Sequence, residues 1–212
     1  MATSTRSEGR AGSAAPLHTG WRAGWRAWLK GAAYSGWGRD RWQRPAEVIA
    51  ALEIQPGVCI AELGSGGGYF TFRLAEAVGP LGKVYAVDVD PDLVDDVAAR
   101  ARRFGANAIE TILADPEDPH LPAAAVDLVF TSNAYHHLSA RADYFRRLRG
   151  CLKPGGRVAI IDSNGGAWFN KLFGHWTARS VIESEMRAAG YRLERALDLV
   201  PAQHFLIFTP TE

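Results

Sequence analysis

Apolar and polar positions follow two different periods along the chain, and the switch between these periods separates strands from helices. Short apolar runs bounded by turn residues are typical of buried strands, whereas apolar residues that recur every three or four positions are typical of helices. The short runs predict strands over residues 58–63, 83–88, 108–113, 126–131, 157–162, 191–199 and 203–208. The longer period predicts helices over residues 45–53, 68–78, 139–151 and 177–189, and a further helix that opens at Asp90–Pro91.

The order of these elements predicts the fold class. Strands that alternate with helices form an α/β domain with a doubly wound, mostly parallel sheet, here of seven strands. The connection between 191–199 and 203–208 is too short for a parallel crossover, so these two strands suit an antiparallel pair. We therefore expect a seven-stranded sheet with an antiparallel C-terminal strand, and ligands at the carboxyl ends of its parallel strands.

The charge pattern changes near Arg44–Pro45. Residues 1–44 hold eight lysines and arginines against two acidic residues, whereas residues 45–212 hold sixteen against twenty-one. Five of the seven tryptophans also lie in the first segment. A break of this kind indicates a boundary, so we expect a disordered tail over 1–20, a helical and aromatic lid segment over 21–44, and the main domain over 45–212.

The N-terminal segment contains an amphipathic stretch at residues 21–33. Trp21, Trp25 and Trp28 recur on one face of the expected helix, and basic side chains flank them. The favoured interpretation is an N-terminal helical appendage that docks on the domain or closes its ligand pocket. Two alternatives stay open, which are peripheral contact with an anionic membrane and contact with a nucleic acid.

Composition favours a reducing compartment, and we expect the protein in the cytoplasm. Apolar residues make up 47% of the chain, enough for a full core, and no apolar run approaches the roughly 20 residues that span a bilayer. Cys59 and Cys151 have no metal-ligand spacing and indicate no disulfide framework. We therefore expect no metal site.

A glycine-rich turn is the main candidate for ligand binding. Gly64, Gly66 and Gly68 follow the first predicted strand and run into a helical pattern. Such strand-to-helix turns let backbone approach a nucleotide-like ligand. The dinucleotide fingerprint G-x-G-x-x-G fails here, because its last glycine would fall on Tyr69. The turn instead has a carboxylate, Glu62, two residues before its first glycine.

Five short motifs in order carry a family resemblance. They are Glu62-x-Gly64-x-Gly66-x-Gly68, Val84–Asp88, Ala114–Asp115, Asp127–Phe130 and Leu152–Gly156. Through these motifs the chain resembles the class I S-adenosylmethionine (SAM)-dependent methyltransferases, and is most similar to small-molecule bacterial enzymes grouped with the ubiquinone and menaquinone C-methyltransferases. The resemblance implies a Rossmann-like fold, SAM as cofactor, and transfer of a methyl group to a small-molecule acceptor.

The resemblance also implies which residues hold the cofactor. Asp88 would accept hydrogen bonds from both ribose hydroxyls, Val89 would pack on the adenine, and Asp115 would bind the adenine amino group. Glu62 and the turn would lie near the amino-acid end of SAM. The alternatives are a buried carboxylate bonded to local backbone N–H groups for Glu62, and a turn residue for Asp115. The expected cofactor set is Glu62, Gly64, Ser65, Gly66, Gly68, Asp88, Val89, Asp115 and Asn133.

The loop after the fourth strand is expected to face the acceptor, as it does in the family. His137 and His136 are the candidate catalytic bases, and a base is needed only if the acceptor must lose a proton. The alternative is that this pair caps the helix that begins at Ser139. Aromatic residues of this loop and of the closing segments, including the loop 163–176, favour a flat or hydrophobic acceptor. The expected acceptor contacts are Tyr34, Trp42, Tyr135 and Trp176.

The loop sequence also narrows the class of acceptor. Ser132–Tyr135 is not the Asn/Asp-Pro-Pro-aromatic tetrad with which amino-methylating enzymes hold a planar nitrogen, so we expect no nucleic-acid acceptor. Two other functions stay open, which are methylation of a membrane-associated quinone or lipid, with 21–33 as the membrane contact, and SAM binding without catalysis. The sequence leaves the methylated atom and the oligomeric state undetermined.

Overall fold

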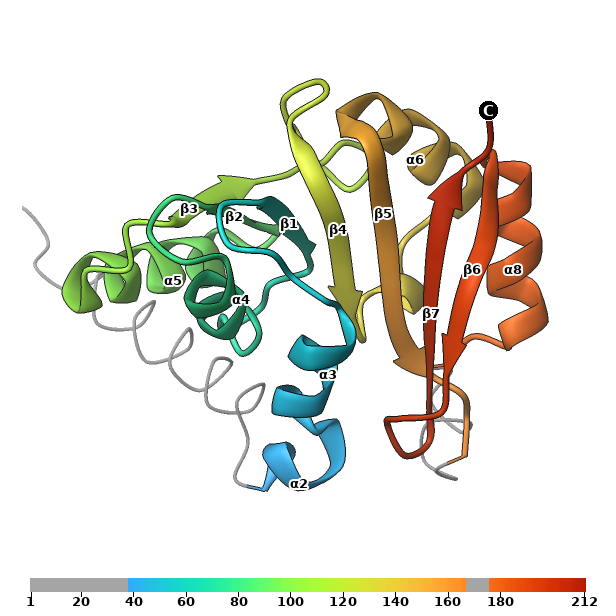
Figure 1. Cartoon of the computed structure of the whole chain (residues 1–212), viewed down its shortest axis with the longest axis horizontal. Helices are drawn as coiled ribbons and strands as arrows, with labels where there is room; N and C mark the ends of the chain where they lie inside the picture. The colour runs from blue at the N-terminus through green and yellow to red at the C-terminus, as the bar shows by residue number, and fades with distance from the viewer. Residues whose placement is uncertain (1–37, 167–175) are drawn as a thin grey trace, which may run out of the picture.

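The computed structural model describes residues 38–166 and 176–212 (Figure 1). The expected tail over 1–20, the amphipathic stretch 21–33 and most of the loop 163–176 lie outside the described residues, so these expectations remain predictions. The described part forms one seven-stranded sheet. Its strands are β1 (Cys59–Leu63), β2 (Lys83–Asp88), β3 (Ile109–Leu113), β4 (Val126–Ser132), β5 (Leu152–Ser163), β6 (Tyr191–Leu197) and β7 (Gln203–Pro210).

The sheet has the order β3-β2-β1-β4-β5-β7-β6. The pairs β1–β2, β2–β3, β1–β4 and β4–β5 are parallel, whereas β7 runs antiparallel to both β5 and β6. The expected sheet with its antiparallel C-terminal strand is therefore confirmed. The strand order reverses between β1 and β4, and such a switch point places a crevice beyond the carboxyl ends of the strands.

The fifth strand begins five residues earlier than the sequence predicts. Leu152 already pairs with Val126, but the register then shifts, and Arg157 pairs with Leu128. The intervening residues, which include Pro154 and the left-handed Gly155, form an irregular stretch in which β5 has more residues than β4. Proline and glycine obscure the apolar pattern there, and this hides the start of the strand.

The helices of the described part are short and lie on both sides of the sheet (Figure 1). Asp90 caps the longest of them by accepting a hydrogen bond from the Asp92 N–H at 3.1 Å, with Pro91 in the first turn, as the sequence predicts. None of the described helices is long and apolar enough to cross a bilayer. The helices are α2 (Arg39–Gln43), α3 (Pro45–Ala51), α4 (Thr71–Val78), α5 (Pro91–Phe104), α6 (Arg141–Leu148) and α8 (Arg179–Ala188).

Alternate residues along each strand supply two hydrophobic cores, one on each face of the sheet. In β1, Ile60 packs with α3 and α4, whereas its neighbour Ala61 packs with α6 and α8. In β5, Ala159 and Ile160 divide in the same way. This follows from the twofold period of a strand, since successive side chains point to opposite faces. Burial on both faces holds the strand ends, and thus the site, in fixed positions.

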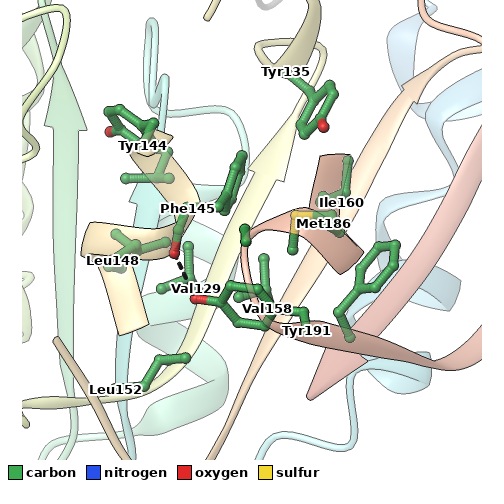
Figure 2. Packing of buried hydrophobic residues seen from close by; sticks show 14 of the residues in the cluster. Val129, Tyr135, Tyr144, Phe145, Leu148, Leu152, Val158, Ile160, Met186 and Tyr191 are labelled. Carbon is green, nitrogen blue, oxygen red and sulfur yellow. Dashed lines mark hydrogen bonds between the residues drawn. The ribbon is translucent and has the colours of Figure 1, made fainter. Parts of the chain in front are cut away.

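The core beneath α6 and α8 is rich in aromatic side chains (Figure 2). The Tyr191 hydroxyl donates a hydrogen bond to the Phe145 carbonyl oxygen at 3.0 Å, which ties β6 to α6. The Tyr135 and Phe145 rings are stacked with centroids 5.5 Å apart. Each fully buried side chain of this size contributes about 1.5–3 kcal/mol to stability.

Candidate functional site

A cleft of about 500 Å³ opens at the carboxyl ends of β1, β2 and β4, near the switch point of the sheet. Its walls come from the glycine turn after β1, the end of β2, the loops after β3 and β4, and the helix α2. A volume of this size suits a small organic ligand. Of the expected cofactor residues, Glu62, Gly64, Ser65, Gly66, Asp88, Val89, Asp115 and Asn133 line the cleft.

The glycine turn is tied to the neighbouring strand by its own backbone. The N–H groups of Gly64 and Ser65 both donate to the Val87 carbonyl oxygen, at 2.9 and 3.0 Å. Gly64 has φ 71°, and a Cβ at this position would lie 2.5 Å from the Cβ of Ala134, on the loop after β4. Glycine is therefore required both by the left-handed backbone and by the close approach of the two cleft walls. Gly68 also has a left-handed φ of 76° and packs against α4 and α5 rather than lining the cleft.

Asp88 ends β2 with its carboxylate held in one orientation. One oxygen accepts a hydrogen bond from the Gly66 N–H at 2.8 Å, and the other accepts from the Asp90 N–H at 3.0 Å. Val89 follows directly and lines the cleft with 55% of its surface exposed. The turn and the end of β2 thus form one rigid wall with a carboxylate and an apolar side chain beside each other.

Asp115 lies at the rim of the cleft, on the loop after β3. Its side chain is 73% exposed, and one carboxylate oxygen is 3.0 Å from Nε2 of His120. Asp115 also exchanges backbone hydrogen bonds with Asp118, so it is a turn residue as well as a cleft residue. The sequence gives no sign that His120 lies beside Asp115, because a lone histidine five residues away has no recognisable motif.

Glu62 is buried beneath the glycine turn, with 3% of its surface exposed. Burial raises its pKa to about 8, although the hydrogen bond from the Thr71 hydroxyl, at 2.5 Å, and the charge of Arg39 oppose this shift. Glu62 therefore accepts a hydrogen bond from a side-chain hydroxyl, whereas the alternative predicted from the sequence was a bond to backbone N–H groups. Glu62 is mostly protonated near neutral pH, and a cation placed beside it would favour the ionised form.

Replacing Glu62 by glutamine should change how stability depends on pH. The folded chain holds a proton on Glu62 up to about pH 8, whereas the unfolded chain releases it near pH 4.5. The wild type therefore loses stability relative to Glu62→Gln as the pH rises through this window, by at most about 1.4 kcal/mol per pH unit. Urea unfolding of both proteins at pH 5, 6.5 and 8 measures the difference. A difference that stays constant with pH would contradict the burial argument.

Asn133 follows β4 and belongs to a closed ring of three carboxamides. Gln43 Nε2 donates to Gln203 Oε1 at 2.9 Å, Gln203 donates to the Asn133 oxygen, and Asn133 Nδ2 donates to Gln43 Oε1 at 3.3 Å. Gln43 is fully buried, and Gln203 nearly so. The ring fixes the side chain of Asn133, which has a left-handed φ of 57°.

The neighbouring residues Tyr135, His136 and His137 form a 3₁₀ turn whose side chains point to different places. His137 is exposed and lines the cleft. His136 is turned inward, with its Nδ1 2.7 Å from a carboxylate oxygen of the fully buried Asp162, and its ring centroid is 4.1 Å from that of His137. The following helix begins at Arg141, two residues later than expected, and its N-cap residue, Ala140, has no side-chain cap hydrogen bond.

Tyr135 does not lie in the cleft, contrary to the expected acceptor contact. Its side chain is fully buried, and its hydroxyl donates to Glu185 at 2.7 Å. The apolar ring is better accommodated in the core under α6 and α8, and Glu185 satisfies its hydroxyl.

The other aromatic residues that were expected to contact the acceptor are not among the described residues that line the cleft. Trp42, on α2, is 45% exposed and contacts the Arg39 guanidinium, 6.0 Å from the ring centroid. Trp176 opens the second described range and is also partly exposed. Neither is among the described residues that line the cleft. Tyr34 lies outside the described residues, as do Trp168, Phe169, Phe173 and His175 of the closing loop.

Cys59 and Cys151 are separate free thiols. Within residues 38–166 and 176–212, no three His, Cys, Asp or Glu side chains gather in a way that could hold a metal ion.

Comparison with known proteins finds similarity to methyltransferases. Residues 61–160 match the methyltransferase domain family. The chain is 35% identical over 116 residues to nocamycin O-methyltransferase of Saccharothrix syringae, covering 53% of this chain and 40% of that protein. It is 31% identical over 113 residues to aklanonic acid methyltransferase of Streptomyces sp. strain C5, covering 53% of this chain and 51% of that protein. The chain thus spans about half or less of these curated relatives.

The fold is also shared with solved structures. A SAM-dependent methyltransferase from Aquifex aeolicus superimposes with a TM-score of 0.78 at 22% identity, and the match covers 84% of this chain and 95% of that one. At 22% sequence identity, this structural similarity shows a shared fold and nothing more. The match covers a larger share of the chain than residues 61–160 alone.

Proposed function

Because this chain belongs to the class I SAM-dependent methyltransferase family, we propose that it transfers a methyl group from SAM to a small aromatic or hydrophobic acceptor. The observation that carries the proposal is the arrangement of the cleft around β1. The glycine turn and Asp88 form one wall, and Asn133 and His137 form the other. One wall has groups suited to a nucleoside, and the other has groups suited to an acceptor.

The residues of the cleft fit SAM. The missing side chain of Gly64 lets the two walls approach, and the fixed carboxylate of Asp88 faces the space between them. Asp88, Val89 and Asp115 would hold the adenosine part, and the protonated Glu62 lies under the turn. When bound, SAM supplies an electrophilic methyl group on a positively charged sulfur. The chain itself then has to align the acceptor and exclude water.

His137 is the residue placed to accept a proton from an acceptor O–H or N–H group. It lies on the acceptor wall and faces the cleft. Behind it, the Asp162 carboxylate fixes the His136 ring, and the His136 ring contacts His137. His136 and Asp162 would therefore position His137, because a buried and hydrogen-bonded ring gives its neighbour a firm support.

A small acceptor is supported by the charges of the cleft. Among the described lining residues there is one arginine and no lysine, whereas a nucleic-acid site needs several cationic groups for phosphates. The relatives nocamycin O-methyltransferase and aklanonic acid methyltransferase are named for small-molecule acceptors. The membrane-associated alternative depends on residues 21–33, outside the described part, and no described contact favours it.

Replacing Asp88 by alanine should weaken the binding of SAM. The variant loses the carboxylate assigned to the ribose hydroxyls, and we expect a loss of about 1–3 kcal/mol, or roughly 5- to 150-fold in Kd. Isothermal titration with SAM measures the change. Asp95→Ala, which removes an exposed carboxylate from α5, is the matched control and should leave Kd unchanged. Equal Kd values for wild type and Asp88→Ala would remove the ribose assignment.

The acceptor class is tested by following the demethylated product, S-adenosylhomocysteine (SAH). The full chain is incubated with SAM and with separate panels of phenols, carboxylic acids, amines, an isoaspartyl peptide and transfer RNA. We expect SAH release and a methyl mass increment with members of the small-molecule panels. Methylation of the peptide or the RNA alone would overturn the small-acceptor proposal. Binding of SAM without product in every panel would favour a non-catalytic module.

A further inference from the structure

The helix α2 brings a cationic side chain to the cleft from outside the matched methyltransferase domain, residues 61–160. The Arg39 guanidinium lies 3.9 Å from the centroid of the Tyr69 ring, and both residues line the cleft. The Tyr69 hydroxyl donates to Asp40 at 2.5 Å. Arg73, on α4, stacks on the same ring at 4.3 Å and forms an ion pair with Asp40 at 3.2 Å. These contacts hold α2 against the beginning of α4, next to the glycine turn.

The cleft is otherwise acidic. Its described walls carry the carboxyl groups of Glu62, Asp88, Asp90 and Asp115, and Arg39 is the single arginine or lysine among them. Burial lowers the pKa of Arg39, while Tyr69 and Glu62 oppose this shift, so Glu62 interacts electrostatically with the guanidinium. An arginine still stays charged in such a place. Partial desolvation of the guanidinium makes an anionic ligand group a favourable partner.

SAM itself has one anionic group. Its amino-acid end carries an ammonium and a carboxylate on the same carbon, whereas its adenosine end carries no anionic group. Asp88 and Asp115 lie after β2 and β3, on one side of β1, and would hold the adenosine. Glu62 and Arg39 lie together beneath and beside the glycine turn. The amino-acid end therefore meets a carboxyl group and a guanidinium at the same place.

We propose that Arg39 binds the carboxylate of the amino-acid end of SAM, and that α2 is thereby part of the cofactor site. A guanidinium can form two parallel hydrogen bonds to a carboxylate, which gives geometric specificity as well as attraction. The inference rests on the proposed function, in that SAM is the ligand of the cleft. It adds a binding residue that the glycine turn and the resemblance do not indicate.

The same short helix also reaches the acceptor wall. Gln43, at the end of α2, belongs to the carboxamide ring that fixes Asn133. Binding of Arg39 to the cofactor carboxylate would restrict the motion of α2. Through Gln43, it would also restrict the side chain of Asn133. One helix thus connects the occupied cofactor site with the residue that faces the acceptor.

The test compares two ligands that differ in the carboxylate alone. SAH has both the ammonium and the carboxylate, and S-adenosyl-3-thiopropylamine keeps the ammonium and lacks the carboxylate. Isothermal titration of the full chain with each ligand gives the contribution of the carboxylate. We expect Arg39→Gln to weaken SAH about 10- to 100-fold and to change the affinity for the decarboxylated ligand less than about threefold.

Two further variants separate recognition from folding. Arg41→Gln removes an exposed charge from the same helix and should change neither affinity. Arg39→Lys keeps the charge without the planar fork and should give an intermediate affinity for SAH. Equal weakening of both ligands by Arg39→Gln, or no weakening of either, would overturn the proposal. Failure of the wild type to bind SAH, or binding without methyl transfer, would instead count against the proposed function.

Discussion

Among substitutions that add a single methyl group, Gly64→Ala is expected to have the largest effect on the cleft. The added Cβ would lie 2.5 Å from the Cβ of Ala134, a distance that forces the backbone to shift. Alanine at φ 71° also adds about 1–2 kcal/mol of backbone strain. Because the turn and the loop after β4 are opposite walls of the cleft, we expect SAM affinity to fall by about 3 kcal/mol, roughly 150-fold.

Two controls separate the collision from the strain. Gly105→Ala imposes a similar left-handed strain, at φ 65°, but its Cβ meets nothing within 4 Å. It should lower the free energy of unfolding without changing SAM affinity. The double variant Gly64→Ala with Ala134→Gly removes the colliding methyl group and should recover part of the affinity. Isothermal titration and urea unfolding of the four proteins measure both quantities, and normal SAM binding by Gly64→Ala would contradict the geometry.

Replacing His137 by alanine is expected to have the largest effect on the reaction, provided that the acceptor loses a proton. Removal of a positioned base lowers the rate by about 100-fold or more. The affinity for SAH should stay unchanged, because His137 lies on the acceptor wall across β1 from Asp88. The measurement is kcat across pH 6–9 with an acceptor found in the panels, together with titration of SAH.

Chemical rescue distinguishes a base from a structural residue. Added imidazole should restore part of the activity of His137→Ala, since it can enter the space of the missing ring. It should not rescue His136→Ala, because the His136 side chain is only 8% exposed and supports the loop through Asp162. Full activity of His137→Ala with an acceptor that must lose a proton would exclude His137 as the base.

The sequence predicts well which residues form the cleft wall after β1 and β2, because that wall depends on local spacing. Gly64 and Asp88 follow the ends of predictable strands, and parallel strands bring their carboxyl ends to the same edge of the sheet. The spacing of the glycines alone separates this turn from a dinucleotide fingerprint. Local sequence thus predicts where these strands end and which residues follow them.

The cleft wall after β4 is less predictable, because its contacts join distant segments. Gln43 and Gln203 are 160 positions apart, and no local pattern pairs them with Asn133. Tyr135, His136 and His137 are adjacent in sequence, yet the 3₁₀ turn sends the first two inward and His137 to the cleft. The partners that decide this, Glu185 and Asp162, come from α8 and β5 and become visible only in the folded chain.

The most direct test of the account is the choice of ligand by the unmodified full chain. Isothermal titration is carried out with SAM, SAH and NAD under the same conditions. We expect SAM and SAH to bind in a one-to-one ratio and NAD to give no binding heat, because the turn has the glycine spacing and the carboxylates suited to SAM. Tight binding of NAD with no binding of SAM or SAH would contradict it.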